Sequence, residues 1–287
     1  MLYAHGKKIN SSLAQVMAVI NITDDSFYAP SRVKKIDDVL KRAQLMLDAG
    51  ASILDIGGES TRQYNGKGCY QAVTPEQEMD RVLPMIEALR KNTDACLSVD
   101  TQSTQVMKEA VKLGVDMIND VNAFQAEAAM DVLAKSNVAA CFMHRKPREK
   151  MRLPYVDVLK EVKRFLHSCL HRCVEHGIDL NRIVLDPGFG FDKDLSDNLH
   201  LLAHLSAFND LGCPLLIGVS RKSMFEVSLG LPIEDRLPPS LSTAVYAYGQ
   251  GVRFFRVHDV KETVDALGFI QCIDDAKKRH LEREQIS

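Results

Sequence analysis

The sequence predicts a single-domain α/β protein, a (β/α)8 TIM barrel. Eight short apolar segments, rich in β-branched residues, alternate along most of the chain with longer amphipathic segments. This alternation predicts parallel strands joined by helical crossovers. Eight such units in 287 residues match the size of a barrel. Nearly every predicted strand is followed by a polar or charged residue, as at a barrel's active-site face, which favours a barrel over an open doubly wound sheet.

The predicted elements follow one another without a Gly/Ser-rich linker or a break in composition. The strands are expected at residues 16–20, 52–56, 96–99, 117–119, 139–143, 183–185, 215–219 and 254–257. The helices are expected at residues 33–49, 75–91, 104–113, 155–175, 198–208, 241–249 and 261–278. Residues 1–287 are therefore predicted to form one domain, of which 277–287 is a solvated helix end or a frayed tail.

Composition excludes several classes of protein. A formal net charge of −2 gives no reason to expect nucleic acid or an anionic membrane surface as a partner. No stretch approaches the roughly 18–20 apolar residues that span a bilayer, and the first residues lack the features of a signal peptide. The seven cysteines include no C-x-x-C pair, so reduced thiols in a cytoplasmic protein are expected.

Polar side chains gather at the carboxyl ends of the predicted strands. In chain order these are Asn21, Asp55 with Glu59, Asp100, Asn119 with Asp120, Met143 with His144, Asp186, Ser220 with Arg221 and Lys222, and Arg256 with His258. Any one of them alone is equally well explained as a helix cap. Capping does not explain Lys, Arg and His together at strands seven and eight, so a shared ligand site is the better interpretation of the set.

The chemistry of these residues divides into two groups. Carboxylates and an amide, at Asp100, Asn119 and Asp186, suit a flat, nitrogen-rich heterocycle that presents N–H and NH2 donors beside a carbonyl. Cations come from strands seven and eight, where barrels frequently bind phosphate. Of these, Arg256 and His258 are two residues apart on one strand and so share a face. A heterocycle that carries a phosphate-like group is the ligand these residues predict.

Two glycine-containing loops add weaker signals. GGESTR, at residues 57–62, permits close approach of the backbone to a ligand, with Thr61 and Arg62 as donors to an anion. LDPGFGF, at residues 185–191, places Phe191 as an apolar wall. Either loop is also compatible with an ordinary βα turn, and neither matches a dinucleotide or P-loop pattern. The histidines and cysteines of residues 167–176 lie on opposed faces of one helix, which predicts structural roles rather than a metal site.

Nearly the whole chain resembles the dihydropteroate synthases. The motifs VMAVINITDDSF, GASILDIGGESTR, LSVDT, GVDMINDV, MH, IVLDPGFGF, LLIGVSRKSM and RVHDVKET occur in the order of that family. The pair SRKS and RVHD is the most specific of them. Methyltetrahydrofolate–corrinoid methyltransferases are similar around the heterocycle site but generally lack this pair. The resemblance implies a pterin-binding barrel that joins 6-hydroxymethyl-7,8-dihydropterin pyrophosphate to 4-aminobenzoate in folate biosynthesis.

The resemblance also implies residue roles, position by position. The pterin would be bound by Asp100, Asn119, Met143, Asp186, Lys222 and Arg256. The pyrophosphate would be held by Asn21, Arg256 and His258, with Asn21 also contacting Mg2+ as the cofactor. The 4-aminobenzoate site would be formed by Thr61, Arg62, Phe191 and Ser223. The catalytic residues would be Asn21, Lys222, Arg256 and His258. A homodimer is implied too, through the apolar helix faces of residues 241–248 and 264–273, although core burial explains those faces equally well.

The chain departs from the family pattern in its loops. The first loop, residues 23–31, lacks a proline, an aspartate and both glycines of the usual T-P-D-S-F-S-D-G-G. After Arg62 a longer segment replaces the usual proline and glycine, RKPREKM follows His144, and Pro238 and Pro239 stand where small residues are common. These changes surround the second substrate. We therefore expect intact pterin binding but altered 4-aminobenzoate affinity and sulfonamide sensitivity.

Three other functions remain open from the sequence alone. They are methyl transfer from a reduced folate to a corrinoid protein, a weakly active pterin-binding paralogue, and a Schiff-base aldolase that uses Lys222. The SRKS and RVHD motifs argue against the first, and the altered first loop keeps the second open. The cluster of Asp and Asn residues would have no use in the third.

Overall fold

The computed structural model describes the backbone of residues 1–22, 29–58, 73–145 and 157–284. Its strands are β1 (Leu2–Ala4), β2 (Lys7–Ile9), β3 (Gln15–Asn21), β4 (Ile53–Gly57), β5 (Cys96–Asp100), β6 (Met117–Asp120), β7 (Ala139–Met143), β8 (Ile183–Asp186), β9 (Leu216–Ile217) and β10 (Phe254–Val257). Its α-helices are α1 (Ala29–Asp48), α2 (Pro75–Asn92), α3 (Thr104–Lys112), α4 (Ala129–Ala134), α5 (Val158–Glu175), α6 (Leu195–Ala203), α7 (Met224–Leu229), α8 (Leu237–Gly249) and α9 (Val260–Glu284).

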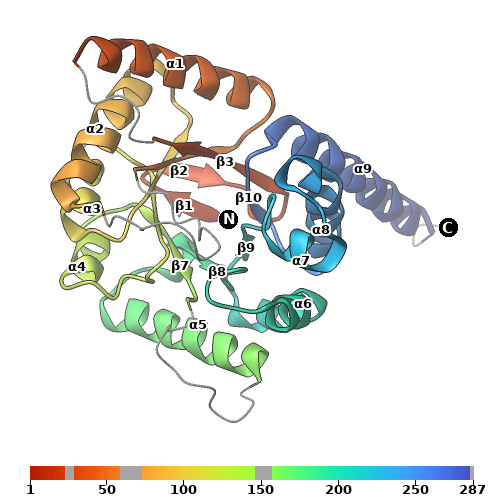
Figure 1. The fold of residues 1–287 in the computed structure, drawn as a ribbon. Helices are drawn as coiled ribbons and strands as arrows, with labels where there is room; N and C mark the ends of the chain where they lie inside the picture. The colour runs from red at the N-terminus through yellow and green to blue at the C-terminus, as the bar shows by residue number, and fades with distance from the viewer. Residues whose placement is uncertain (23–28, 59–72, 146–156, 285–287) are drawn as a thin grey trace.

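Eight parallel strands form a nearly closed barrel, which confirms the predicted fold. Their order is β8-β7-β6-β5-β4-β3-β10-β9, and a parallel bridge between Leu185 and Leu215 joins the two ends. The helices lie around this ring of strands (Figure 1). Such strands are buried on both faces, which explains why they appear in the sequence as almost continuous apolar segments. The carboxyl ends of all eight strands consequently meet at one rim.

The inner face of the barrel changes character along each strand. Near the amino ends it is apolar, with a cluster that includes Met17, Ile53, Cys96, Met117, Ala139, Val184, Leu216 and Phe254. Two residues further along, the same face carries Asp55, Ser98 and Asn119, all buried. The register pairs Asn21 with Gly57 and Gly57 with Asp100, which places these residues one step nearer the rim. The alternation of strand side chains therefore builds an apolar floor beneath a polar upper layer.

A short amino-terminal hairpin, β1–β2, closes the bottom of the barrel and is absent from the elements that the sequence predicts. Leu2, Ala4 and Ile9 belong to the same buried cluster as the barrel floor. The hairpin turns at His5 and Gly6, with φ values of 47° and 84°, a conformation that suits a two-residue hairpin turn. The ammonium of Lys7 donates to Asp116 Oδ2 at 2.8 Å and so ties the hairpin to the loop before β6. Strands of three residues are too short to show periodicity in a sequence.

Several element boundaries differ from the predicted ones. The predicted strand at 215–219 is shorter in the structure, and the short helices α4 and α7 were not predicted. Helix α8 begins four residues earlier than expected, because Pro238 and Pro239 occupy its first turn, where no N–H is required. Helix α9 continues to Glu284, so the described part of the predicted tail is a helix end.

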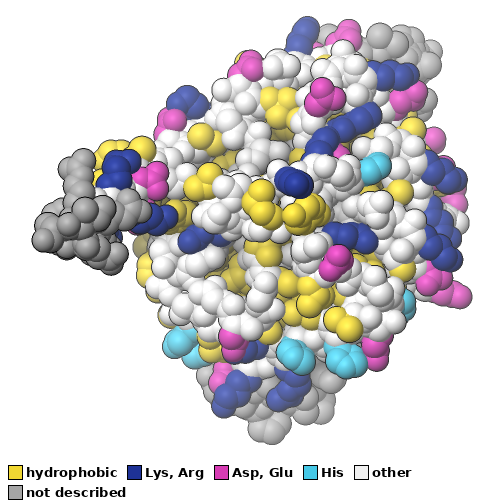
Figure 2. Space-filling model, turned by 180° about the vertical axis from the view of Figure 1, so that it is seen from behind, with side chains coloured by type: hydrophobic (Ala, Val, Ile, Leu, Met, Phe, Trp, Pro, Cys, Tyr) yellow, Lys and Arg dark blue, Asp and Glu magenta, His cyan; other side chains and the backbone are white. Residues whose placement is uncertain are grey.

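The surface carries mixed charge. Lys and Arg side chains are interspersed with Asp and Glu over the face seen in Figure 2. Across the described ranges, no helix is both long enough and apolar enough to span a bilayer.

Candidate active site

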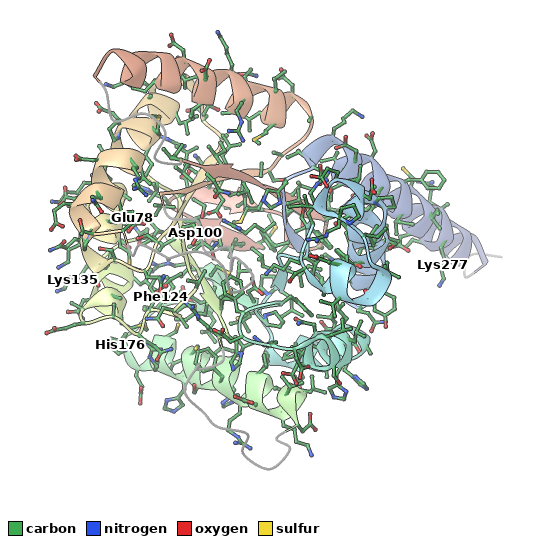
Figure 3. All side chains as sticks on the ribbon, viewed as in Figure 1. Glu78, Asp100, Phe124, Lys135, His176 and Lys277 are labelled. Atoms are coloured by element: carbon green, nitrogen blue, oxygen red, sulfur yellow. The ribbon has the colours of Figure 1, made fainter. Side chains whose placement is uncertain are left out.

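The structure brings the acidic residues of the central strands and the cations of the last two units to the same rim. Asp100 ends β5 near the middle of the molecule, whereas Lys135 and His176 lie at its periphery, at the ends of α4 and α5 (Figure 3). Arg256 of β10 contacts this central region from a position 156 residues further along the chain. The convergence predicted from the sequence is therefore observed.

Arg256 is the centre of the upper layer. Its Nε donates to Asp55 Oδ2 at 2.6 Å, and its Nη2 donates to Asp100 Oδ2 at 2.7 Å. Asn119 Nδ2 donates to the same Asp55 oxygen at 3.3 Å. Burial by itself lowers the pKa of Arg256, but Asp55 and Asp100 outweigh it and raise the pKa above its ordinary value. The guanidinium thus stays charged and crosslinks three strands.

Asp55 is visible in the sequence as a residue near a strand end, but its role emerges only from the structure. Its side chain is fully buried, and its Oδ1 has no hydrogen-bond partner among the described residues. Such an orphaned acceptor costs free energy unless it meets a donor. Asp55 holds Arg256 from below, so it belongs to the site as the support of that guanidinium.

A second group of contacts surrounds Asp186 at the end of β8. Its Oδ1 accepts the backbone N–H of Gly188 at 2.7 Å. Lys222 donates to the carbonyl of Phe189, and its Nζ lies 4.4 Å from the centre of the Phe191 ring. The loop after β8 therefore carries Asp186 and Phe191 to the cation of the next unit.

Glycine is required at position 190 of this loop. Its φ is +81°, and a Cβ there would lie 3.1 Å from Lys222 Cδ. A left-handed backbone conformation is costly for other residues. The G-F-G part of the motif thus lets the lysine approach the loop backbone.

Burial shifts the pKa values of both Lys222 and Asp186. It lowers the pKa of Lys222 to about 8, although Asp186 favours the charged ammonium. It also raises the pKa of Asp186, against the Gly188 hydrogen bond and the charge of Lys222. Burial likewise raises the pKa of Asp100, although Arg256 opposes this. Perturbed groups that share one buried site are typical of functional sites.

Asn21 and His258 lie on the side of the rim formed by β3 and β10. A Cβ on Gly57 would lie 3.6 Å from both Asn21 Oδ1 and Asp100 Cβ, so Gly57 keeps the space between them open. His258 is exposed beyond the end of β10, with its backbone N and its Nδ1 each 3.2 Å from Ser220 Oγ. Both side chains thus lie at the rim, one at the end of β3 and the other just beyond β10.

Sequence reasoning missed the role of Arg221. Its guanidinium donates to both carboxylate oxygens of Asp259 at 2.8 Å and to the carbonyl of Ile233 at 2.8 Å. Its φ of 53° is uncommon for a residue other than glycine. This bidentate pair joins the loop of Lys222 and Ser223 to the loop of His258.

Two features singled out in the sequence lie outside the cluster. Asp120 accepts the backbone N–H groups of Asn122 and Phe124, each at 2.7 Å, and so closes its own loop. In the segment 167–176, Cys169 and Cys173 are buried, while His171 pairs with Glu175 at 3.3 Å. The described residues contain no group of three or more His, Cys, Asp or Glu placed to hold a metal.

The second-substrate half of the predicted site is described only in part. Phe191 is partly exposed beside Lys222, and exposed Ser223 immediately precedes α7. Thr61 and Arg62 lie outside the described residues, as do Glu59 and most of the divergent loops after β3, β4 and β7. Met143 is buried at the end of β7 and pairs in register with Asp186.

The arrangement suits one kind of ligand. Acceptors and an amide lie deep in the upper layer, and cations lie beside them and above them toward the rim. A flat heterocycle with N–H donors fits the first set, and an anionic substituent fits the second. Preorganised cations of this kind also stabilise a negative charge that develops on a departing group.

Comparisons with known proteins agree with this chemistry. The sequence pattern of the pterin binding enzyme family matches residues 17–258. A dihydropteroate synthase of Escherichia coli K12 is 39% identical over 280 residues, covering 96% of this chain and 98% of that protein. A solved structure of the Yersinia pestis dihydropteroate synthase with a sulfonamide drug has a TM-score of 0.85 and 41% identity, covering 96% of this chain and 99% of that chain.

A third similar protein is the dihydropteroate synthase of Xanthomonas albilineans, solved with 4-aminobenzoic acid. It has a TM-score of 0.85 and 39% identity, covering 94% of this chain and 96% of that chain. The matches thus extend over nearly all of the barrel and its rim. This chain belongs to the pterin binding enzyme family and, within it, to the dihydropteroate synthases.

Proposed function

We propose that this transferase joins 6-hydroxymethyl-7,8-dihydropterin pyrophosphate to 4-aminobenzoate, forming 7,8-dihydropteroate and pyrophosphate. The observation that carries the proposal is the cluster in which Arg256 contacts Asp55 and Asp100 beside Asn119. Solved relatives contain a pterine-sulfa conjugate and 4-aminobenzoic acid, which supports the same substrates here.

The pterin is proposed to bind in the upper layer of the barrel. Its N–H and NH2 groups meet the acceptors Asp100 and Asp186, and the Asn119 amide both donates and accepts. Lys222 donates to the ring carbonyl and the adjacent nitrogen. The planar guanidinium of Arg256 stacks on the ring, and buried Met143 supplies a wall of the pocket.

The pyrophosphate is proposed to lie at the rim, between His258 and Asn21. Mg2+ usually takes one or two protein oxygens together with phosphate oxygens. The side chain of Asn21 offers an amide oxygen beside the open space at Gly57, so the donor set fits an ion that arrives with the pyrophosphate. When bound, Mg2+ would neutralise part of the pyrophosphate charge.

The reaction requires little acid–base chemistry from the protein. The bond from the pterin methylene carbon to the pyrophosphate oxygen breaks, and its electron pair leaves with the pyrophosphate. The neutral arylamine then forms the new C–N bond and releases a proton to solvent. Arg256 and His258 stabilise the developing negative charge, which is where electrostatic help lowers the barrier most.

A turnover assay tests the proposed function. The protein is supplied with the pterin pyrophosphate, 4-aminobenzoate and Mg2+, and both pyrophosphate and 7,8-dihydropteroate are quantified. The two products should appear in equal amounts, and omission of 4-aminobenzoate should abolish the dihydropteroate. Absence of dihydropteroate, from protein that binds the pterin, would show a pterin-binding paralogue instead.

Affinity for the second substrate is expected to differ from that of relatives. Most of the divergent residues lie in the loops after β3, β4 and β7, and Pro238 and Pro239 lie in the first turn of α8, whereas the pterin residues match the family. Calorimetric titration should therefore give ordinary affinity for the pterin but changed affinity for 4-aminobenzoate and for a sulfonamide. The Escherichia coli relative titrated alongside is the control, and equal affinities for all three ligands would contradict the expectation.

We further propose a homodimer through α8 and α9. Both helices expose large apolar side chains, with Tyr246 47%, Phe269 68% and Ile273 49% exposed. Light scattering of the purified protein should give twice the chain mass, and Phe269→Glu should shift it toward the monomer. A monomeric mass for the unmodified chain at micromolar concentration would refute this proposal.

A further inference from the structure

One buried lysine near the site has no part in the chemistry described above. Lys193, in the loop after β8, is only 7% exposed. Lysine is rarely buried without a charged partner. Among the described residues, its ammonium donates to two backbone carbonyls, those of Gly188 at 2.7 Å and His144 at 3.1 Å. The burial of this ammonium group, held only by backbone carbonyls among the described residues, calls for a physical explanation.

The two carbonyls belong to two loops that touch through their backbones. A Cβ on Gly188 would lie 1.8 Å from the carbonyl oxygen of His144, so only glycine fits there. The backbone N–H of His144 donates to the Asp186 carbonyl at 2.9 Å. Lys193 thus fastens the loop after β7 to the loop after β8, directly beside Asp186.

Adjacent carbonyls of this loop are held by different lysines. Lys193 binds the carbonyl of Gly188, and Lys222 binds the carbonyl of Phe189. The N–H of Gly188, on the amino-terminal side of both carbonyls, donates to the Asp186 carboxylate. Loss of either lysine would loosen the loop segment that directly follows this N–H.

Charge supports the same conclusion. Asp186 is buried, which raises its pKa, and Lys222, Lys193 and Arg256 each oppose that rise. Cys141 faces it from β7 as a neutral thiol, because burial raises the pKa of that thiol well above its ordinary value.

Lys193 has charged neighbours of its own. Burial lowers the pKa of Lys193 to about 7, and the positive charge of Lys222 lowers it too. The carboxylates of Asp186, of Asp197 on α6 and of Glu161 on α5 favour the charged ammonium and oppose this shift. Below about pH 7, Lys193 therefore adds positive charge near Asp186.

We propose that Lys193 is a positioning residue: it clamps the loop that orients Asp186 and places a positive charge near that carboxylate, which prepares it for the pterin. The inference rests on the proposed role of Asp186 as a pterin anchor. Lys193 itself touches neither substrate nor the reacting atoms.

The test measures binding of 6-hydroxymethylpterin by calorimetry between pH 5 and pH 8. The variants are Lys193→Met, which removes charge and hydrogen bonds, and Lys193→Gln, which keeps a donor without the charge. Both variants should bind the pterin about tenfold more weakly. The pH below which binding fails should rise by roughly one unit, because a tenfold change in an equilibrium constant corresponds to a shift of one pKa unit. KM for 4-aminobenzoate should stay within about twofold.

Lys193→Arg should retain the wild-type pH dependence below about pH 7, where both side chains are charged, and Lys193→Gln still decides the matter if Lys193→Met does not fold. A pH dependence shifted below pH 7 in Lys193→Arg, or unchanged affinity and pH dependence in a folded neutral variant, overturns the proposal. Exposed Lys135 provides the matched control, Lys135→Met, expected to behave as wild type (Figure 3). Failure of the wild-type protein to bind the pterin would instead refute the proposed function.

Discussion

Lys222→Ala is expected to lower kcat/KM for the pterin pyrophosphate by on the order of 10²-fold or more. The ammonium of Lys222 is the cation beside Asp186, and it contacts the loop that carries Phe191. Its removal takes away a donor to the pterin ring and leaves the Asp186 carboxylate with less positive charge around it. Steady-state kinetics with the pterin pyrophosphate varied at saturating 4-aminobenzoate measures the loss.

Two comparisons make the Lys222 prediction specific. Lys261→Ala removes an exposed lysine that pairs with Asp265 on α9, and it should leave kcat/KM unchanged. In the wild-type protein kcat/KM should fall as pH rises through about 8, because Lys222 loses its proton there. Lys222→Arg should abolish this fall, since a guanidinium stays charged. Persistence of the fall in Lys222→Arg would show that another group causes it.

Arg256→Met is expected to destabilise the fold by about 3–5 kcal/mol and to abolish turnover. Asp55 is fully buried, and Arg256 donates to it at 2.6 Å. Without the guanidinium, the Asp55 charge stays inside the barrel with the weaker Asn119 contact at 3.3 Å. Urea denaturation at pH 8 measures the change in the free energy of unfolding.

The same variant should regain stability relative to wild type as the pH falls. Burial already raises the pKa of Asp100, and loss of Arg256, which opposes that rise, raises it further. The folded variant then binds more protons than the unfolded chain, so its stability increases toward acid pH. The double variant Asp55→Asn with Arg256→Met should recover part of the loss. Purely additive destabilisation would contradict the proposed coupling between the two side chains.

The sequence predicted the barrel and its rim because both follow from simple patterns. Strands buried on both faces leave apolar segments, and the carboxyl ends of parallel strands share one edge. Asp100, Asp186 and Arg256 were therefore placed together without any knowledge of distances. The β1–β2 hairpin was not predicted, and β9 was predicted to be longer than it is, because segments of two or three residues show no periodicity.

Contacts between residues far apart in the sequence could not be predicted from the sequence. Asp55 and Arg256 are 201 residues apart, and nothing local in either segment indicates their contact. The roles of Lys193 and Arg221 were missed for the same reason, although Lys193 stands only two residues after the G-F-G-F motif. The Mg2+ role of Asn21, the homodimer and the cytoplasmic location stay predictions.

The alternation along the barrel strands links folding to catalysis. A slip of one residue in the pairing of β3 would turn Asn21 toward the helices and bring Ile20 toward the substrates. It would also direct Met17 away from the barrel floor. Mispaired chains would therefore lose both the core and the ligand pocket at once, so any sequence selected to make the product is also selected to fold in one register.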